Sequence, residues 1–230
     1  LIVACAGSGK TEVISQRIAG LIGRPDVQPK NIVAFTFTEK AAGELKERVH
    51  TRIRELHGEV HGLAEMYIGT MHGYALDLLH SHVPEAFKYN VLNDVQTRLI
   101  IDKYSTRSGL TTTNAVVRGT EKPLRRWVNS KLYQQVMSIL REDDVDLERL
   151  RPDVADGLDK YMELLSDRAY FDYTAILHNA AVLLNDDNDE GDESVLDLQR
   201  HVKETVKYVV VDEYQDTNPV QEQLIRGLTR

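Results

Sequence analysis

The chain has 230 residues and a formal net charge of −8, with 42% hydrophobic and 28% charged residues, an ordinary balance for a globular protein with ample core. Six acids between residues 186 and 193 carry most of the negative charge, so the composition excludes a global basic field, and any nucleic-acid site must be a local groove. Cys5 is the only cysteine, which excludes an intrachain disulfide, and no run is long enough for a transmembrane helix, so we expect a cytoplasmic protein with no membrane partner.

The start of the chain is typical of a phosphate-binding loop. The apolar run 1–3 leads into Ala4-Cys5-Ala6-Gly7-Ser8-Gly9-Lys10-Thr11, and a helix is predicted to begin near Lys10 and to stop by Gly23. Glycines let backbone N–H groups approach a polyphosphate closely, and the positive end of the helix dipole points at the same place. Lys10 would supply a mobile cation and Thr11 a hydroxyl for Mg²⁺. The residues predicted to bind the phosphates are Ala6, Gly7, Ser8, Gly9, Lys10 and Thr11.

Strands and helices alternate after this loop. Residues 31–37 form a β-rich run, which we predict to be a buried parallel strand, and an amphipathic helix follows over residues 41–56. A short strand at 65–70 and a helix at 72–82 come next. This order is that of the βαβ units of a parallel sheet, so we predict an α/β core whose first part is residues 1–84.

Residues 85–206 have a different character, and we predict an all-helical insertion subdomain with one possible strand at 89–92. Residues 108–120 are polar and rich in glycine and threonine, which favours a loop, and the acidic run 186–193 is expected to be a solvated loop. Trp127, beside Arg125 and Arg126 on a predicted helix, could belong to a DNA-facing patch, but a buried ring covered by its arginine neighbours is the favoured interpretation. Helices are predicted at 93–104, 123–141, 152–166 and from a cap at Asp172.

The chain returns to β character at residues 207–211 and then reaches Asp212-Glu213-Tyr214-Gln215-Asp216. The chemistry of an open parallel sheet takes place at the carboxyl ends of its strands. Asp212 could hold Mg²⁺, directly or through water, and Glu213 could orient an attacking water or accept its proton. An acidic pair after a strand can also cap a helix, but a phosphate-binding loop in the same chain favours nucleotide hydrolysis. We expect residues 207–230 to return to the core.

Four stretches resemble motifs of the UvrD/Rep-type branch of superfamily 1 DNA helicases. In chain order they are residues 4–11 (ACAGSGKT), 36–42 (TFTEKAA), 69–74 (GTMHGY) and 211–221 (VDEYQDTNPVQ). The last is the most specific, and the helical insertion before it also agrees with the family. Cys5 replaces a usual glycine and Glu39 a usual asparagine. Residues 172–177 (DYTAIL) are similar to a DFDDLL segment of the family but lack its second and third acids.

The resemblance implies an incomplete RecA-like P-loop NTPase core with a helical insertion. It implies that ATP and Mg²⁺ drive movement along single-stranded DNA, or opening of a single-strand/duplex junction, with 3′–5′ polarity and in DNA repair or replication. Lys10 and Thr11 would bind the ATP phosphates and Mg²⁺, with Asp212 as a second Mg²⁺ ligand. Glu213 would activate water and Gln215 would sense the state of the nucleotide. The residues implied to line the single-strand path are Phe37, Thr38 and His72.

Three other interpretations stay open. The motor part of an AddA/RecB-type helicase–nuclease can also carry the TFTEKAA variant. A P-loop kinase or switch NTPase would explain Gly7 to Thr11, but neither the acidic run at 212–216 nor the long insertion. A DNA-binding scaffold with an inactive nucleotide site would have no need of an intact Lys10 and Glu213.

The ends of the chain suggest a piece of a longer protein. The sequence begins without Met inside a predicted strand and stops inside a predicted helix. We therefore expect the parent protein to add a glutamine motif that reads adenine and a second RecA-like domain that brings arginines to the γ-phosphate. The 230 residues alone are expected to bind ATP weakly and not to unwind DNA.

Overall fold

The computed structural model describes residues 9–117, 119–143, 145–186 and 192–230. The strand expected at 1–3 and most of the phosphate loop, including Ala6, Gly7 and Ser8, lie outside the described residues.

Within the described residues, the centre of one lobe is a parallel sheet of three strands. Its strands are β1 (Ile32–Phe35), β2 (Tyr67–Gly69) and β7 (Tyr208–Val211). They pair in the order β2-β1-β7, with Phe35 of β1 opposite Gly69 of β2 and Val211 of β7. The three predicted strands and their parallel arrangement are therefore confirmed. Because parallel strands end at the same edge, the segments that follow Phe35, Gly69 and Val211 lie together in space.

Strand β1 is buried on both faces, and its alternating side chains divide the core into two layers. Ile32 and Ala34 pack in one layer, and Val33 and Phe35 in the other. The first layer lies under helices α1 (Lys10–Ile22) and α2 (Glu39–His57). Their contribution to this layer is an apolar stripe at helical spacing, made of Ile18, Leu21, Leu45, Val49 and Ile53.

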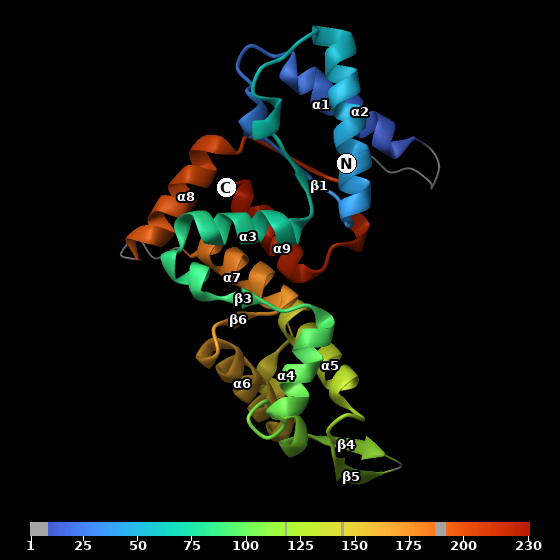
Figure 1. Ribbon diagram of the computed structural model, residues 1–230, viewed down its shortest axis with the longest axis vertical. Coiled ribbons are helices and arrows are strands. Elements are labelled where there is room, and N and C mark those ends of the chain that lie inside the picture. Colours follow the sequence, from blue (N-terminus) through green and yellow to red (C-terminus); the bar gives the residue numbers. More distant parts are fainter. Residues whose placement is uncertain (1–8, 118, 144, 187–191) are drawn as a thin grey trace.

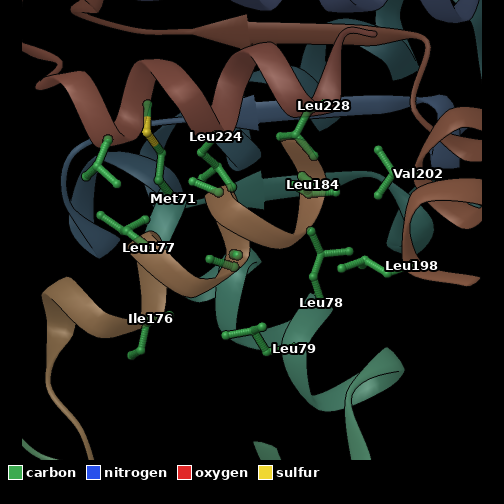
Figure 2. Close-up of a cluster of buried hydrophobic side chains, with 14 of the residues drawn as sticks. Met71, Leu78, Leu79, Ile176, Leu177, Leu184, Leu198, Val202, Leu224 and Leu228 are labelled. Carbon is green, nitrogen blue, oxygen red and sulfur yellow. The ribbon is translucent and has the colours of Figure 1, made fainter. Parts of the chain in front are cut away.

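Four helices cover the other face of the sheet. They are α3 (Met71–His82), α7 (Tyr173–Asn185), α8 (Glu193–Thr205) and α9 (Pro219–Leu228). Figure 2 shows α7, which carries Leu177 and Leu184, lying between α9 with Leu224 and α3 with Leu78. Helix α8, which the sequence did not predict, closes this layer with Leu198.

This packing differs from the expected boundary of the insertion at residue 206. Helices α7 and α8 share one hydrophobic core with β1, α3 and α9, so a cut at 206 would divide that core. We call the sheet with α1, α2, α3, α7, α8 and α9 the sheet lobe. We call residues 90–171, which leave this core and return to it, the insertion lobe.

The insertion lobe has its own core beneath helices α4 (Asp94–Lys103), α5 (Ser130–Glu142) and α6 (Pro152–Asp167). In Figure 1 these helices lie at the opposite end of the molecule from α1 and α2. The largest side chains of this core are Ile101, Leu110, Tyr133, Met137 and Tyr161. Among the residues that the structure describes, the short 3-10 helices are Pro29–Asn31, Leu63–Glu65, Pro84–Lys88, Leu110–Thr112, Leu147–Arg149 and Tyr214–Asp216.

The prediction of an all-helical insertion is wrong. The possible strand at 89–92 is confirmed as β3 (Asn90–Val91), but it pairs in parallel with β6 (Tyr170–Phe171), a strand that the sequence did not predict. Strands β4 (Asn114–Val117) and β5 (Thr120–Pro123) form an antiparallel hairpin where a loop was expected. The hairpin turns at Gly119, whose φ of 76° suits glycine, and β5 begins at Thr120. The other glycine and the other threonines of the expected loop lie before the hairpin, in and beside a 3-10 helix.

The prediction of a buried Trp127 on a helix is also wrong. Pro123 ends β5 instead of opening a helix, and α5 begins only at Ser130. Trp127 lies in the intervening turn with φ of 64°, and 60% of its surface is exposed. Its backbone N–H donates to the buried carboxylate of Asp102 at 2.7 Å, which holds the turn in this conformation.

A buried ion pair ties the two lobes together. The guanidinium of Arg141, in the last turn of α5, donates to both carboxylate oxygens of Asp172, which caps α7. Tyr161 of α6 donates to the same carboxylate at 2.7 Å, and Ala175 donates its backbone N–H at 2.8 Å. Burial alone would raise the pKa of Asp172, but the Arg141 charge and these hydrogen bonds hold that pKa below its usual range.

Within the described ranges, no helix has the length and apolar character needed to cross a membrane.

Candidate nucleotide and DNA site

The N-terminus of α1 carries the described part of the predicted phosphate loop. Gly9 has φ of 84°, a left-handed conformation that suits glycine, and is the N-cap of the helix. Because Gly9 has no side chain, it caps none of the first N–H groups of α1, which are the groups that bind anions at helix N-termini. Lys10 and Thr11 follow in the first turn, and both are partly buried.

The carboxyl end of β7 places two acids beside that helix. The backbone N–H of Asp212 donates to the carbonyl of Phe35 at 2.9 Å, which extends the sheet by one step. Glu213 then turns sharply, with φ of 53° and ψ of 44°. This turn brings its Oε2 to 2.6 Å from Nζ of Lys10, a residue 203 positions earlier in the chain. The structure therefore brings together Lys10 and Glu213, two residues predicted to act in one site.

The charges of this pair support one another. The hydrogen bond to Glu213 raises the pKa of Lys10, and the hydrogen bonds from Lys10 and Gln215 lower the pKa of Glu213. Burial and the neighbouring charge of Glu213 raise the pKa of Asp212. Lys10 and Glu213 are thus both ionised at neutral pH, and Asp212 is a carboxylate that would gain from a nearby cation.

Gln215 joins the same contact from the other side. Its Nε2 donates to Oε2 of Glu213 at 2.6 Å, so one carboxylate oxygen accepts from both Lys10 and Gln215. A change in the position of the Glu213 carboxylate would therefore change the hydrogen bond that Gln215 donates to it.

A small cavity of about 40 Å³ lies at the edge of the sheet where the strands end. Two of the three predicted DNA-contacting residues, Phe37 and His72, line it together with Asp212. Phe37 is 43% exposed, so it is no core residue, and it is available for stacking. His72 is mostly buried, and burial lowers its pKa, which keeps the ring neutral at pH 7.

The third predicted DNA contact, Thr38, has a different local role. Its hydroxyl accepts the backbone N–H of Ala41 at 3.1 Å and so caps α2. Next to it, Glu39 accepts a hydrogen bond from the Thr70 hydroxyl at 2.8 Å, which ties the TFTEKAA segment to the GTMHGY segment. Thr38 is thus at the edge of the cavity-lining strands without lining the cavity itself.

Two further residues at this cavity were given no role from the sequence. Gln221, in the first turn of α9, lines the cavity, and the ring of Tyr173 packs edge-on to His72 with centroids 5.7 Å apart. Tyr173 is 46% exposed. Gln221 is the last residue of VDEYQDTNPVQ, and Tyr173 is the second residue of DYTAIL. Both residues therefore lie in segments that the sequence singled out, although neither was assigned a function.

The donor set fits Mg²⁺ and a nucleoside triphosphate. The N–H groups of α1 and the Lys10 ammonium suit phosphates, and Asp212 with the Thr11 hydroxyl offers two oxygen ligands. Two protein ligands suit Mg²⁺, which otherwise keeps waters and phosphate oxygens. Across the part of the chain that the structure describes, no group of three or more His, Cys, Asp or Glu side chains could hold a metal unaided.

Comparison with known proteins agrees with this geometry. The protein-family model for the UvrD/REP helicase N-terminal domain matches residues 1–230. The chain belongs to this family. It is 31% identical over 99% of its length to the ATP-dependent DNA helicase UvrD1 of Mycobacterium leprae. It is 30% identical over its whole length to the ATP-dependent DNA helicase Rep of Buchnera aphidicola, and 29% identical over 99% to a probable DNA helicase of Mycoplasma pneumoniae.

The chain spans 28% of the UvrD1 relative, 31% of the Rep relative and 41% of the Mycoplasma relative. Family membership implies a RecA-like fold, and the observed parallel sheet with helices on both faces agrees with it.

Proposed function

We propose that this chain is the ATP-binding part of an ATP-dependent DNA helicase that moves along single-stranded DNA. The contact between Lys10 and Glu213, at 2.6 Å, carries the proposal, because it joins the phosphate loop to the acidic motif at the end of β7. The names of the relatives support ATP and DNA as the substrates.

The nucleotide would bind at the N-terminus of α1. The N–H groups of α1 and Lys10 would hold its phosphates, and Thr11 and Asp212 would hold Mg²⁺, which neutralises phosphate charge when bound. A polyphosphate there would compete with Glu213 for the Lys10 ammonium. Once released from Lys10, the ionised Glu213 could orient a water and accept its proton, because carboxylates are general bases of this kind.

Gln215 would report the state of this site. It donates to the same Glu213 oxygen as Lys10, so a carboxylate that turns toward water changes the hydrogen bond of Gln215. The loop that carries Gln215 leads directly into α9, which lines the cavity at the sheet edge.

Single-stranded DNA would pass over this edge of the sheet. Phe37 would stack on a base, His72 and Thr38 would line the path, and the exposed ring of Tyr173 would extend it toward α7. A neutral His72 suits this place, because its ring can form hydrogen bonds with base or phosphate groups. Such contacts do not depend on a global basic field. We extend the proposal to 3′–5′ movement, action at single-strand/duplex junctions and a role in repair or replication.

The division of the chain follows the same proposal. Residues 1–84 and 207–230 would belong to the ATPase core, with the insertion subdomain between them. From the packing we place the body of that subdomain at residues 90–171, with α7 and α8 as part of the core. A second RecA-like domain of the same parent protein would complete the nucleotide site.

The test is ATP hydrolysis by the full-length protein with and without single-stranded DNA. The proposal expects Mg²⁺-dependent hydrolysis that rises when single-stranded DNA is added, and Lys10→Ala should abolish both rates. A replacement of the exposed Lys30, which is far from the motif, serves as the matched control. Hydrolysis that is indifferent to DNA, or that survives Lys10→Ala, would contradict the proposal.

A further inference from the structure

Glu142 occupies the point where the insertion lobe meets the sheet lobe. It is the last residue of α5, next to Arg141 of the buried ion pair. Its Oε1 accepts a hydrogen bond from the Thr174 hydroxyl in the first turn of α7. Its Oε2 accepts from Nδ2 of Asn218, the N-cap of α9, at 3.1 Å. One carboxylate of the insertion lobe thus holds the beginnings of two helices of the sheet lobe.

Each partner of Glu142 is connected to a residue that lines the cavity at the sheet edge. Asn218 and Gln221 form a reciprocal cap, in which Gln221 N–H donates to Asn218 Oδ1 at 2.9 Å and Asn218 N–H donates to Gln221 Oε1 at 3.2 Å. Gln221 lines the cavity with Phe37 and His72. The position of Asn218 therefore sets the position of a cavity wall.

The second partner leads to the same cavity by another route. Thr174 follows Tyr173, whose ring packs against His72. Of the residues in these two routes, His72 and Gln221 line the cavity, and Glu142 reaches them through Tyr173 and Asn218.

The chemistry of the contact requires an acceptor toward Asn218. The Asn218 amide group that faces Glu142 only donates, whereas the Thr174 hydroxyl can donate or accept. A glutamine could keep both contacts, with its oxygen toward Asn218 and its N–H₂ group toward Thr174. A methionine has about the same length but no hydrogen-bonding group of comparable strength, so it removes both contacts.

We propose that Glu142 is a positioning residue, which fixes the beginnings of α7 and α9 around the cavity and thereby sets the affinity for single-stranded DNA. The inference rests on the proposed function, since it assigns the cavity to DNA. The hydrophobic layer between α7 and α9 does not involve Glu142, so the loss of its contacts leaves the packing of these helices in place (Figure 2).

The experiment uses Glu142→Met in the full-length protein. The concentration of single-stranded DNA that half-saturates ATP hydrolysis should rise about tenfold, a coupling of ordinary size. The rate without DNA, the KM for ATP and the melting temperature should match those of the unmodified protein. The matched control is Glu163→Met, which makes the same replacement on the exposed surface of α6 and should leave all four quantities unchanged.

A reversed pair provides the rescue. Asn218→Asp alone sets two carboxylates against each other, while Asn218→Asp with Glu142→Gln restores a donor opposite an acceptor with the polarity exchanged. Aspartate caps helices as well as asparagine does, so α9 keeps its cap. The double variant should recover DNA half-saturation to within about threefold of the unmodified protein, less than the coupling it restores.

The possible results distinguish a failure of the proposed function from a failure of the role given to Glu142. An unmodified protein that single-stranded DNA does not stimulate overturns the proposed function and this inference with it. A stimulated protein whose Glu142→Met variant keeps normal DNA half-saturation overturns the inference alone. So does a variant that loses its DNA-free rate and melting temperature together, or a double variant that shows no recovery.

Discussion

The buried pair of Arg141 and Asp172 gives a prediction about stability. In both residues the side chain is 6% exposed, and the guanidinium supplies two of the four hydrogen bonds that reach the carboxylate. Arg141→Met keeps much of the volume but removes those two bonds and leaves a buried charge with only Tyr161 and the Ala175 N–H as partners. Breaking a buried pair in this way costs about 3–5 kcal/mol.

The assay is urea unfolding of the 230-residue chain at pH 7. The variant and the unmodified chain are compared with the same dependence of the free energy of unfolding on urea concentration, so that a shift of the midpoint reports a change in stability alone. The control is Arg107→Met, because Arg107 pairs with Asp167 at the surface, where the two side chains are 52% and 49% exposed. An exposed pair of this kind contributes less than about 1 kcal/mol.

A second variant checks the cause. Asp172→Asn removes the charge and keeps one oxygen for the Ala175 N–H at the cap of α7, while the Tyr161 hydroxyl can accept from the new amide, so the double variant should lose less stability than the two single losses added together. The pH dependence has a definite sign. Because the folded pKa of Asp172 lies below its ordinary 3.8, its contribution is complete above that value and is lost as the pH falls through the folded pKa. A loss below about 1 kcal/mol in Arg141→Met at pH 7 would refute the reasoning, since that is the range of a surface pair.

Three further predictions concern single-stranded DNA, acid and the thiol. Phe37→Ala in the full-length protein should weaken binding of single-stranded DNA between about 5-fold and 150-fold, whereas Phe37→Tyr should bind normally, because one stacked base contributes about 1–3 kcal/mol; equal affinities in a titration would contradict the stacking role. In the folded chain burial lowers the pKa of four histidines, His50, His72, His178 and His201. The unfolded chain therefore takes up more protons than the folded chain below pH 6.5, and the free energy of unfolding should fall as the pH drops from 7 toward 5.5. A free energy of unfolding that stays constant or rises over this range in denaturant titrations would contradict the prediction. Labelling of Cys5, in the phosphate loop, should inactivate ATP hydrolysis slowly, with protection by ATP, and full activity after complete labelling would exclude a position near the nucleotide.

The sheet and its edge could be predicted from the sequence because their signals are local. The β-rich runs at 31–37 and 207–211 predict parallel strands, and the rule that chemistry lies at carboxyl strand ends places Asp212 and Glu213 at one edge. The contact between Lys10 and Glu213 follows from that topology, although no local pattern links residues so far apart.

The insertion lobe was harder to predict because tertiary contacts override its local signals. Pro123 suits the first turn of a helix, but its neighbours pair with β4, and Trp127 is held in a turn by a hydrogen bond to Asp102, which is distant in sequence. The assignment of α7 and α8 to the sheet lobe depends on which core their apolar faces meet, and amphipathic spacing carries no information on the partner.

Glu142 shows the same limit at the level of a single residue. In the sequence it is one of several acids after a helical stretch, with no motif around it. Its two partners, Thr174 and Asn218, come from helices that meet only in the folded chain.

The most direct test of the account is Glu213→Gln in the full-length protein, measured for ATP binding and for ATP hydrolysis with single-stranded DNA. The account predicts that ATP binding persists and that hydrolysis falls by at least about 10²-fold, the range lost with a general base. Glu222→Gln, which removes a carboxylate from α9 nearby, is the control and should hydrolyse ATP normally. Hydrolysis at the unmodified rate in Glu213→Gln, with ATP binding intact, would contradict the account.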